Sequence, residues 1–343
     1  MGTLKPIRVL IIDDSLVSRE ILRKGLAGDR RLQVVGLAGD PYEAVEKIED
    51  LEPDVLTLDI NMPKMDGLTF LTKLMAQLPL PVVVISSSAE RVFDAMEKGA
   101  VDFVAKPAIS SPADLETFLE EVVEKVKIAA SVKMYLHAPT AVPEEMTPSV
   151  KAVKDIRVIA MGASTGGTDA LLKVLKGLPM NIPGIVIVQH MPPVFTRMYA
   201  ERLDQQCALS VSEAKTGDEV KPGSVLIAPG DQHIKIVKDQ QRCVVRCFRG
   251  DKVSGHCPSV DVLFESAALT VGAKAMGVLL TGMGSDGARG LLTMRKAGAY
   301  TLGQDKDSSV VYGMPMVAYN IGAVVRQLPL ERIPSEILRH LSR

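Results

Sequence analysis

The sequence predicts an α/β protein of two domains, each built on a parallel sheet. The chain has 343 residues, more than one hydrophobic core usually serves. Short apolar runs alternate with segments of helical periodicity along most of its length. A proline-bearing stretch, residues 137–149, interrupts this alternation, as an extended linker would. We therefore expect a first domain over 1–130, a linker over 131–153 and a second domain over 154–343.

The first domain is predicted to contain five strand–helix units. Runs rich in Val, Ile and Leu, typical of buried parallel strands, occupy residues 8–12, 33–37, 54–58, 81–85 and 101–105. The clearest helical segments are 68–78 and 115–126. Regular alternation of this kind indicates a doubly wound parallel sheet.

The second domain is predicted to be doubly wound as well, with a mainly parallel sheet. Buried-strand runs occur at residues 157–159, 185–188 and 277–280. Leu171, Val174, Leu175 and Leu178 follow the first run at helical spacing. Residues 224–248 carry strand-like segments separated by turn residues, and we expect antiparallel β-hairpins there.

Charge and hydropathy restrict the classes of function. With 40 basic and 41 acidic residues the net charge is -1, which gives no electrostatic support for binding nucleic acid. No apolar run reaches membrane-spanning length, and the N-terminus lacks the apolar run of a signal peptide. We expect a cytoplasmic protein without membrane insertion.

Polar residues follow successive predicted strands of the first domain: Asp13, Asp14, Asp59, Ser86 and Lys106. Such positions meet at one edge of a parallel sheet. Carboxylates crowded there repel one another unless a hard cation such as Mg²⁺ joins them. The lysine and serine can then meet an incoming phosphoryl group. A helix N-cap, a turn residue or a solvated lysine explains each residue singly, but their joint placement favours a site.

This constellation resembles a response-regulator receiver domain over about residues 5–127, with DINMPKMDG at 59–67 and Lys106-Pro107 as further motifs. The resemblance implies a flavodoxin-like five-stranded fold and phosphorylation of Asp59 by a sensor histidine kinase. It also implies a cis Lys106-Pro107 bond. The implied roles are Mg²⁺ binding by Asp13, Asp14, Asp59 and the Asn61 backbone, and phosphoryl sensing by Ser86, Lys106 and Phe103.

The second domain carries G-x-S-x-G at 162–166, between a predicted strand and a predicted helix. That context suits a nucleophile elbow bearing Ser164, although a phosphate-binding glycine loop needs the same backbone. His190 and Asp286 follow two other predicted strands, so all three side chains reach one sheet edge. A phosphate loop does not require this His and Asp. We expect His190 to activate Ser164, and Asp286 to orient His190.

These segments resemble the methylesterase domain of the chemotaxis protein-glutamate methylesterases, over about residues 155–338. The motifs are GASTGG at 162–167, QHMP at 189–192, APGDQH at 228–233, PSVD at 258–261 and GMGSDG at 282–287. The resemblance implies phosphorylation-activated hydrolysis of glutamyl methyl esters on methylated chemoreceptors, without a cofactor, and a possible deamidation of receptor glutamines. It also implies that the Met283 N–H holds the oxyanion, with Thr165 as a supporting hydroxyl.

Two questions stay open at this point. His233 and His256 also compete for the role of base on chemistry alone. Otherwise His233 lines the substrate cleft together with Pro258 and Ser259, and His256 either lines it as well or, as the favoured interpretation, is a surface-loop residue. The alternative function is a non-enzymatic two-component response regulator whose C-terminal domain binds a ligand or a protein.

Overall fold

The computed structural model describes residues 5–107, 111–132 and 156–342. The chain divides into two compact units, Met1–Thr140 and Ala141–Arg343, which we describe separately. The expected linker, 131–153, lies almost entirely outside the described residues.

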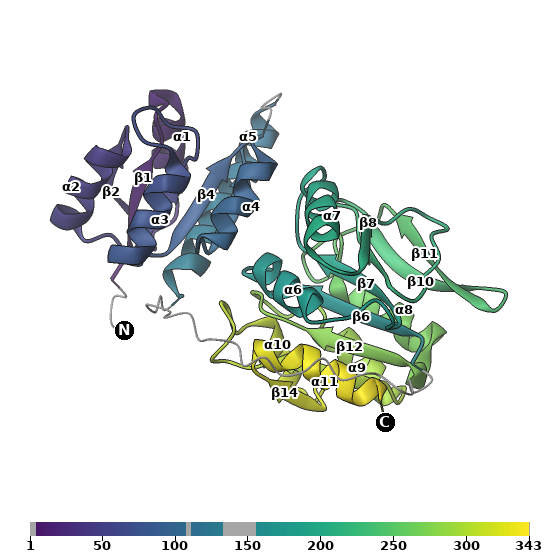
Figure 1. Ribbon diagram of the computed structural model, residues 1–343. Helices are drawn as coiled ribbons and strands as arrows, with labels where there is room; N and C mark the ends of the chain where they lie inside the picture. Colours follow the sequence, from purple (N-terminus) through teal and green to yellow (C-terminus); the bar gives the residue numbers. More distant parts are fainter. Residues whose placement is uncertain (1–4, 108–110, 133–155, 343) are drawn as a thin grey trace. The chain divides into compact units, whose positions relative to one another are not determined.

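The N-terminal unit contains a five-stranded sheet whose strands are all parallel, as predicted. Its order is β2-β1-β3-β4-β5 (Figure 1). The strands are β1 (Ile7–Ile12), β2 (Leu32–Ala38), β3 (Val55–Leu58), β4 (Val82–Ser86) and β5 (Asp102–Ala105). Strands β3 and β4 are buried along their whole length, which explains why the sequence shows continuous apolar runs there, whereas β2 is buried only at its two ends.

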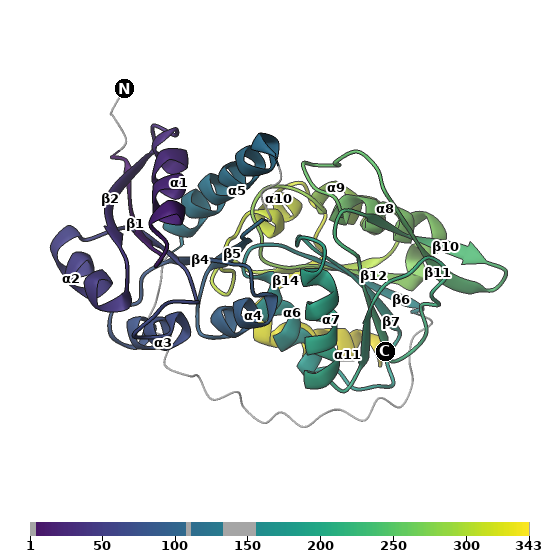
Figure 2. The ribbon, with the colours of Figure 1, turned by 90° about the horizontal axis from the view of Figure 1, so that it is seen from above.

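Helices cover both faces of this sheet. Figure 2 shows α1 and α5 on one face and α2, α3 and α4 on the other. Their bounds are α1 (Leu16–Ala27), α2 (Pro41–Leu51), α3 (Gly67–Gln77), α4 (Ala89–Glu97) and α5 (Pro112–Ala130). Helix α5 begins at a reciprocal capping box of Ser111 and Asp114, and it buries Phe118, Val122 and Val126 at helical spacing. Each such side chain contributes about 1.5–3 kcal/mol through burial.

The C-terminal unit is organised around a seven-stranded parallel sheet in the order β14-β13-β12-β6-β7-β9-β8. Its strands are β6 (Val158–Ala163), β7 (Gly184–Gln189), β8 (Ser210–Glu213), β9 (Ser224–Ile227), β12 (Ala275–Leu279), β13 (Tyr300–Gln304) and β14 (Arg326–Leu328). Strand β6 lies at the centre, paired with β7 on one side and β12 on the other. The strand order reverses there, so the loops after these three strands meet at a topological switch point.

Two layers of helices enclose this second sheet. Figure 2 shows α8, α9 and α10 on one face and α6, α7 and α11 on the other. The bounds are α6 (Gly167–Lys176), α7 (Phe195–Gln206), α8 (Val260–Thr270), α9 (Ala288–Lys296), α10 (Met314–Asn320) and α11 (Ile333–Leu341), with 3-10 turns at Gly272–Lys274 and Leu330–Arg332. Helix α8 packs against the sheet, α9 and β10, and its Phe264 is fully buried.

Two sequence predictions about local structure are wrong. Residues 224–227 do not belong to a hairpin, because β9 is buried along its whole length and pairs in parallel with β7 and β8. The hairpin is β10 (His233–Asp239) with β11 (Arg242–Phe248). The cis bond expected at Lys106-Pro107 is not found, and Lys106 reaches its carboxylate partners without it; among the described residues the one cis bond is Cys257-Pro258.

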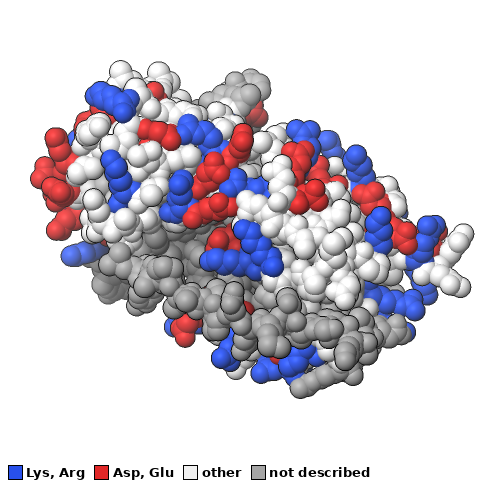
Figure 3. Space-filling view, in the orientation of Figure 1, with Lys and Arg blue, Asp and Glu red and all other residues white. Residues whose placement is uncertain are grey.

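The surface carries charges of both signs. Lys and Arg side chains are interspersed with Asp and Glu side chains on the face that Figure 3 displays. Within the described parts of the chain, every helix is too short or too polar to cross a lipid bilayer.

Candidate active site

Ser164 occupies the turn between β6 and α6, at the edge where the sheet ends. Its backbone N–H donates to the Thr281 carbonyl at 3.0 Å, and its carbonyl accepts from Gly167 N at 2.7 Å. Gly166 has φ 74, a left-handed conformation that a glycine adopts without strain. The sharp turn leaves the serine half-buried in front of the α6 N-terminus, as the elbow interpretation predicts.

His190 bridges the serine and the aspartate. Its Nδ1 lies 3.1 Å from Ser164 Oγ, and its Nε2 lies 2.9 Å from Asp286 Oδ2. The side chain is 9% exposed. Gln189, the last residue of β7, donates from Nε2 to the carbonyls of both Ser164 and His190, so it ties the two loops together. The structure thus brings together the three residues that follow predicted strands: Ser164, His190 and Asp286.

Asp286 lies in the loop between β12 and α9, and its buried carboxylate faces the N-terminus of α8. Its carboxylate accepts hydrogen bonds from the backbone N–H groups of Val260 and Asp261 at 2.7 and 3.0 Å, and from the Ser259 hydroxyl at 2.7 Å. Burial by itself raises the pKa of Asp286, but the hydrogen bonds from His190 and from these donors outweigh it and hold the pKa below its usual value. The group therefore stays ionised and accepts the Nε2 proton of His190, which leaves Nδ1 free to accept from the serine.

His233, Pro258 and Ser259, which we expected to line a substrate cleft, offer little surface to a substrate. All three residues are buried. His233 accepts from Ser259 N on Nδ1 at 3.2 Å and contacts the Asp251 carbonyl through Nε2 at 2.9 Å. Ser259 supports the Asp286 carboxylate through its hydroxyl, and His233 in turn holds the Ser259 backbone. A serine directly before an apolar helical run was the available sign that Ser259 begins a helix.

The loop after β12 faces the serine from the other side. A Cβ added to Gly282 would lie 2.7 Å from Ser164 Cβ, so only a glycine permits this close approach. Met283 follows at half exposure, and within the described residues no hydrogen bond uses its N–H. Thr165 is buried, and its carbonyl accepts from the Thr281 hydroxyl at 3.0 Å. The oxyanion role expected of the Met283 N–H stays a prediction.

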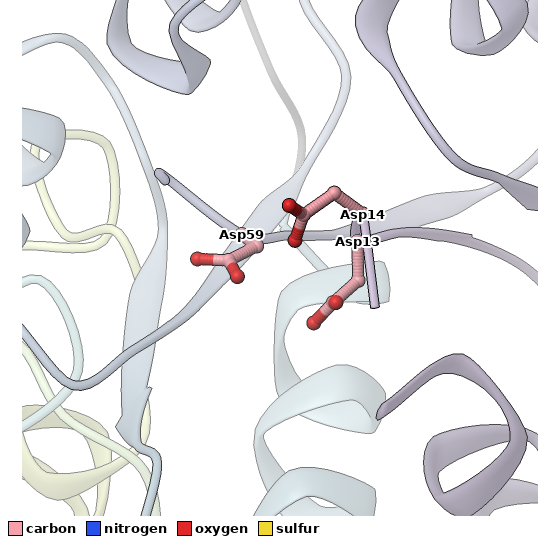
Figure 4. Close-up of side chains that lie close together, drawn as sticks. All are labelled: Asp13, Asp14 and Asp59. Carbon is pink, nitrogen blue, oxygen red and sulfur yellow. The ribbon is translucent and has the colours of Figure 1, made fainter. Parts of the chain in front are cut away.

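A second cluster lies at the strand ends of the N-terminal unit. Figure 4 shows Asp59, which follows β3, beside Asp13 and Asp14, which follow β1. One carboxylate oxygen from each lies within 4.8 Å of the others. Burial raises the pKa of Asp13 above its usual value, against the lowering effect of Lys106. A cluster of oxygen ligands that is short of positive charge suits a hard cation such as Mg²⁺.

Lys106 is the cation already present in this cluster. Its Nζ lies 2.8 Å from Asp13 Oδ2 and 2.5 Å from Asp59 Oδ2. Its backbone N–H donates to the carbonyl of Ser86, a fully buried residue at the end of β4. The lysine therefore contacts Asp59 directly, and the role expected of Ser86 stays a prediction.

The remaining two predicted residues of this site differ in position. Asn61 donates its backbone N–H to Asp59 Oδ1 at 3.2 Å, while its side chain accepts from Arg91 at 2.5 Å. Phe103 is buried on β5, with its ring centroid 6.3 Å from that of Phe93. It lies in the core of the N-terminal unit.

Two family models match the chain, one for each unit. Residues 9–120 match the response regulator receiver domain, and residues 159–337 match the CheB methylesterase. A relative from Syntrophomonas wolfei, named protein-glutamate methylesterase/protein-glutamine glutaminase 2, is 51% identical over 96% of each chain. A protein of the same name from Pseudomonas aeruginosa is 48% identical over 98% of each chain.

A solved structure is similar to the C-terminal unit. The CheB methylesterase catalytic domain of Thermotoga maritima is 38% identical, with a TM-score of 0.52, and the match covers 53% of this chain and 97% of that one. The chain therefore belongs to the CheB methylesterase family, with a response regulator receiver domain ahead of the methylesterase domain.

Proposed function

We propose that this chain is a phosphorylation-activated protein-glutamate methylesterase that acts on methylated chemoreceptors. The observation that carries the proposal is the continuous contact from Ser164 through His190 to Asp286, at 3.1 and 2.9 Å. The printed names of full-length relatives support the same activity.

In the first half of the reaction, Ser164 Oγ attacks the γ-carbonyl carbon of a glutamyl methyl ester. His190 Nδ1 takes the serine proton, and the imidazolium that forms faces the ionised Asp286 through Nε2. His190 then gives the proton to the methoxy oxygen as the C–O bond breaks, so methanol leaves and an acyl-serine remains.

In the second half, water attacks the acyl-serine while His190 Nδ1 takes one of its protons. The proton returns to Ser164 Oγ as the acyl bond breaks, and the product is a glutamate side chain. The Met283 N–H supports the oxyanion in both halves, with the Thr165 loop beside it; losing one donor of this kind typically costs about 3 kcal/mol. The same sequence applied to a glutamine side chain releases ammonia, which accords with the double name of the relatives.

The receiver domain supplies the regulation. A receiver implies a phosphodonor kinase, and we assign phosphorylation to Asp59 by a sensor histidine kinase. Asp13, Asp14, Asp59 and the Asn61 carbonyl would hold Mg²⁺, whose charge neutralises the incoming phosphoryl group. We assign contact with that group to Lys106, which is paired with Asp59, and to Ser86, whose carbonyl accepts from the Lys106 N–H. The added charge of about one to two units re-orders the loops around it.

Methyl release from receptor-bearing membranes tests the proposal. Membranes carrying radiolabelled methyl esters should release methanol with the wild-type protein but not with Ser164→Ala, whose thermal melting should match wild type. A folded Ser164→Ala variant that still releases methanol would remove this serine from the mechanism. If the wild-type protein releases none, even when phosphorylated, the non-enzymatic response regulator is the better reading.

A further inference from the structure

A second histidine lies against the catalytic imidazole. The rings of His190 and His256 are stacked, with centroids 3.7 Å apart and planes 13° from parallel. His256 lies in the loop between β11 and α8, and it is intermediate in exposure. This stack adds a face contact to an imidazole whose two nitrogens are already engaged.

The two hydrogen bonds of His190 leave one motion of the ring unrestrained. Both bonds lie in the ring plane, one at Nδ1 and one at Nε2, and together they define an axis. Rotation about that axis tilts the ring while the nitrogens move little, and it spoils the angle at which Nδ1 meets the serine proton. A flat group pressed on the ring face blocks this tilt and keeps water off that face.

The loop that carries His256 is built as a tight hairpin. Val253 and His256 exchange both backbone N–H···O bonds, each 3.0 Å long. The two residues between them, Ser254 and Gly255, have φ 52 and 86, as two-residue hairpin turns require. This geometry fixes the backbone of His256 itself.

Both sides of the hairpin are anchored to buried groups. The Ser254 hydroxyl donates to Asp261 Oδ2 at 2.9 Å, and Asp261 is fully buried while it also accepts from Gly290 N at 2.8 Å. At the start of the loop, the Asp251 carbonyl is bound by the buried His233. The position of His256 over His190 therefore follows from several fixed contacts rather than from one flexible side chain.

We infer that His256 is a positioning residue for the esterase reaction: its ring holds the His190 imidazole in the plane in which Nδ1 faces Ser164 while Nε2 faces Asp286. This inference rests on the proposed catalytic roles of Ser164 and His190. It assigns no proton transfer to His256, whose ring meets His190 face to face.

The test compares His256→Ala, which removes the ring, with His256→Phe, which keeps a flat ring. The matched control is His340→Ala, because His340 is likewise stacked, on Tyr300 at 3.9 Å and 3°, within the same unit. Two rates are measured on the full chain: kcat and KM for receptor methyl ester hydrolysis, and the second-order rate of serine labelling by a fluorophosphonate, which needs no receptor.

His256→Ala should lower both kcat and the labelling rate by about tenfold or more, with KM unchanged, because a small misplacement of a catalytic group is costly. His256→Phe should recover most of the loss, and His340→Ala should match wild type. A labelling rate that stays within about twofold of wild type, or a change in KM alone, overturns the inference.

Two further variants keep the test decisive. If His256→Ala melts far below wild type, Ser254→Ala takes its place, because it removes the hydroxyl that anchors the hairpin to Asp261. Its labelling rate should also fall below that of wild type. Either of two results overturns the inference: an unchanged labelling rate in Ser254→Ala, or a complete loss of activity in His256→Phe. Ser164→Ala separates the two proposals. If it still hydrolyses receptor esters, the proposed function fails; if it is inactive while His256→Ala is fully reactive, only the role of His256 fails.

Discussion

Replacing Asp286 by Asn tests the electrostatics of the site with little change of shape. The polar neighbours of this carboxylate donate to it, including the N–H groups of Val260 and Asp261 and Nε2 of His190. The amide of an Asn carries an NH₂ group in place of one oxygen. Whichever way it turns, that group faces a backbone N–H, because Val260 N binds Oδ2 and Asp261 N binds Oδ1.

Two magnitudes follow from this geometry. Leaving one buried N–H without an acceptor costs about 1–3 kcal/mol of the free energy of unfolding. An Asn NH₂ facing Nε2 also favours the tautomer of His190 that is protonated on Nδ1, which cannot take the proton of Ser164. In a Ser-His-Asp site of another fold this tautomer error lowers kcat by about 10⁴-fold. We expect a fall of that order, equivalent to about 5 kcal/mol of transition-state stabilisation.

The assay measures methanol release from methylated receptor membranes, alongside thermal melting of the variant. Asp305→Asn is the matched control, because Asp305 follows the neighbouring strand β13 and its carboxylate accepts from Ser308 rather than from His190. The control should keep wild-type activity. A folded Asp286→Asn variant with more than about a tenth of wild-type kcat would refute the role given to this carboxylate.

Three other perturbations have defined outcomes. Gly282→Ala places a Cβ 2.7 Å from Ser164 Cβ, so activity should fall at least about tenfold. Gly284→Ala is the control: a Cβ there meets no atom within 4 Å, so this variant should only lower the melting temperature. Equal activities of the two variants would contradict this expectation. Burial raises the pKa of Glu336, but its partners Arg339, Tyr300 and Arg326 prevail and lower it from 4.5 to about 2. The ionised Glu336 adds stability on the order of 1–2 kcal/mol, which is present above pH 4.5 and is lost as pH falls toward 2. The Glu336→Gln variant should therefore lose less stability than wild type over that pH range. Identical acid-unfolding profiles of the two proteins would argue against this role of Glu336. Asp59→Ala should abolish the rise in methanol release that a small-molecule phosphodonor and Mg²⁺ produce with wild-type protein; activation of the variant would exclude Asp59 as the phosphoacceptor.

The sequence predicts the N-terminal sheet well for a physical reason. Strands buried on both faces need uninterrupted apolar runs, and the five predicted runs agree with β1–β5 to within about one residue at each end. The same rule locates β6, β7 and β12, whose ends carry Ser164, His190 and Asp286. Both the end of a strand and a catalytic type of residue after it are visible in a short stretch of sequence, so the sequence alone predicts these three side chains.

Apart from the cis bond expected at Lys106-Pro107, the differences between prediction and structure involve contacts between separate segments of the chain. Nothing within residues 224–227 distinguishes a hairpin strand from a parallel one, because the partners of β9 are β7 and β8. Helix α8 is apolar on almost every side, so it lacks the amphipathic period that marks a surface helix. As a result, the sequence does not reveal the donors that the first turn of α8 offers to Asp286, and it predicts a place in a substrate cleft for His233 and Ser259.

His256 illustrates the same limit. A histidine next to a cysteine in a glycine-bearing loop gives no sign of a stacking partner 66 positions earlier in the chain. The contact depends on a two-residue hairpin turn and on its anchor to Asp261, and both become evident only in three dimensions.

Mapping the adduct of a fluorophosphonate by peptide mass spectrometry tests the central claim most directly, because such a reagent reacts with a serine only when a neighbouring base activates it. We predict one adduct in the folded full-length protein, on the peptide that carries Ser164, and its loss in His190→Ala and Ser164→Ala. A folded wild-type protein that forms no adduct, or an adduct that persists in Ser164→Ala, would contradict the assignment of Ser164 as the activated nucleophile.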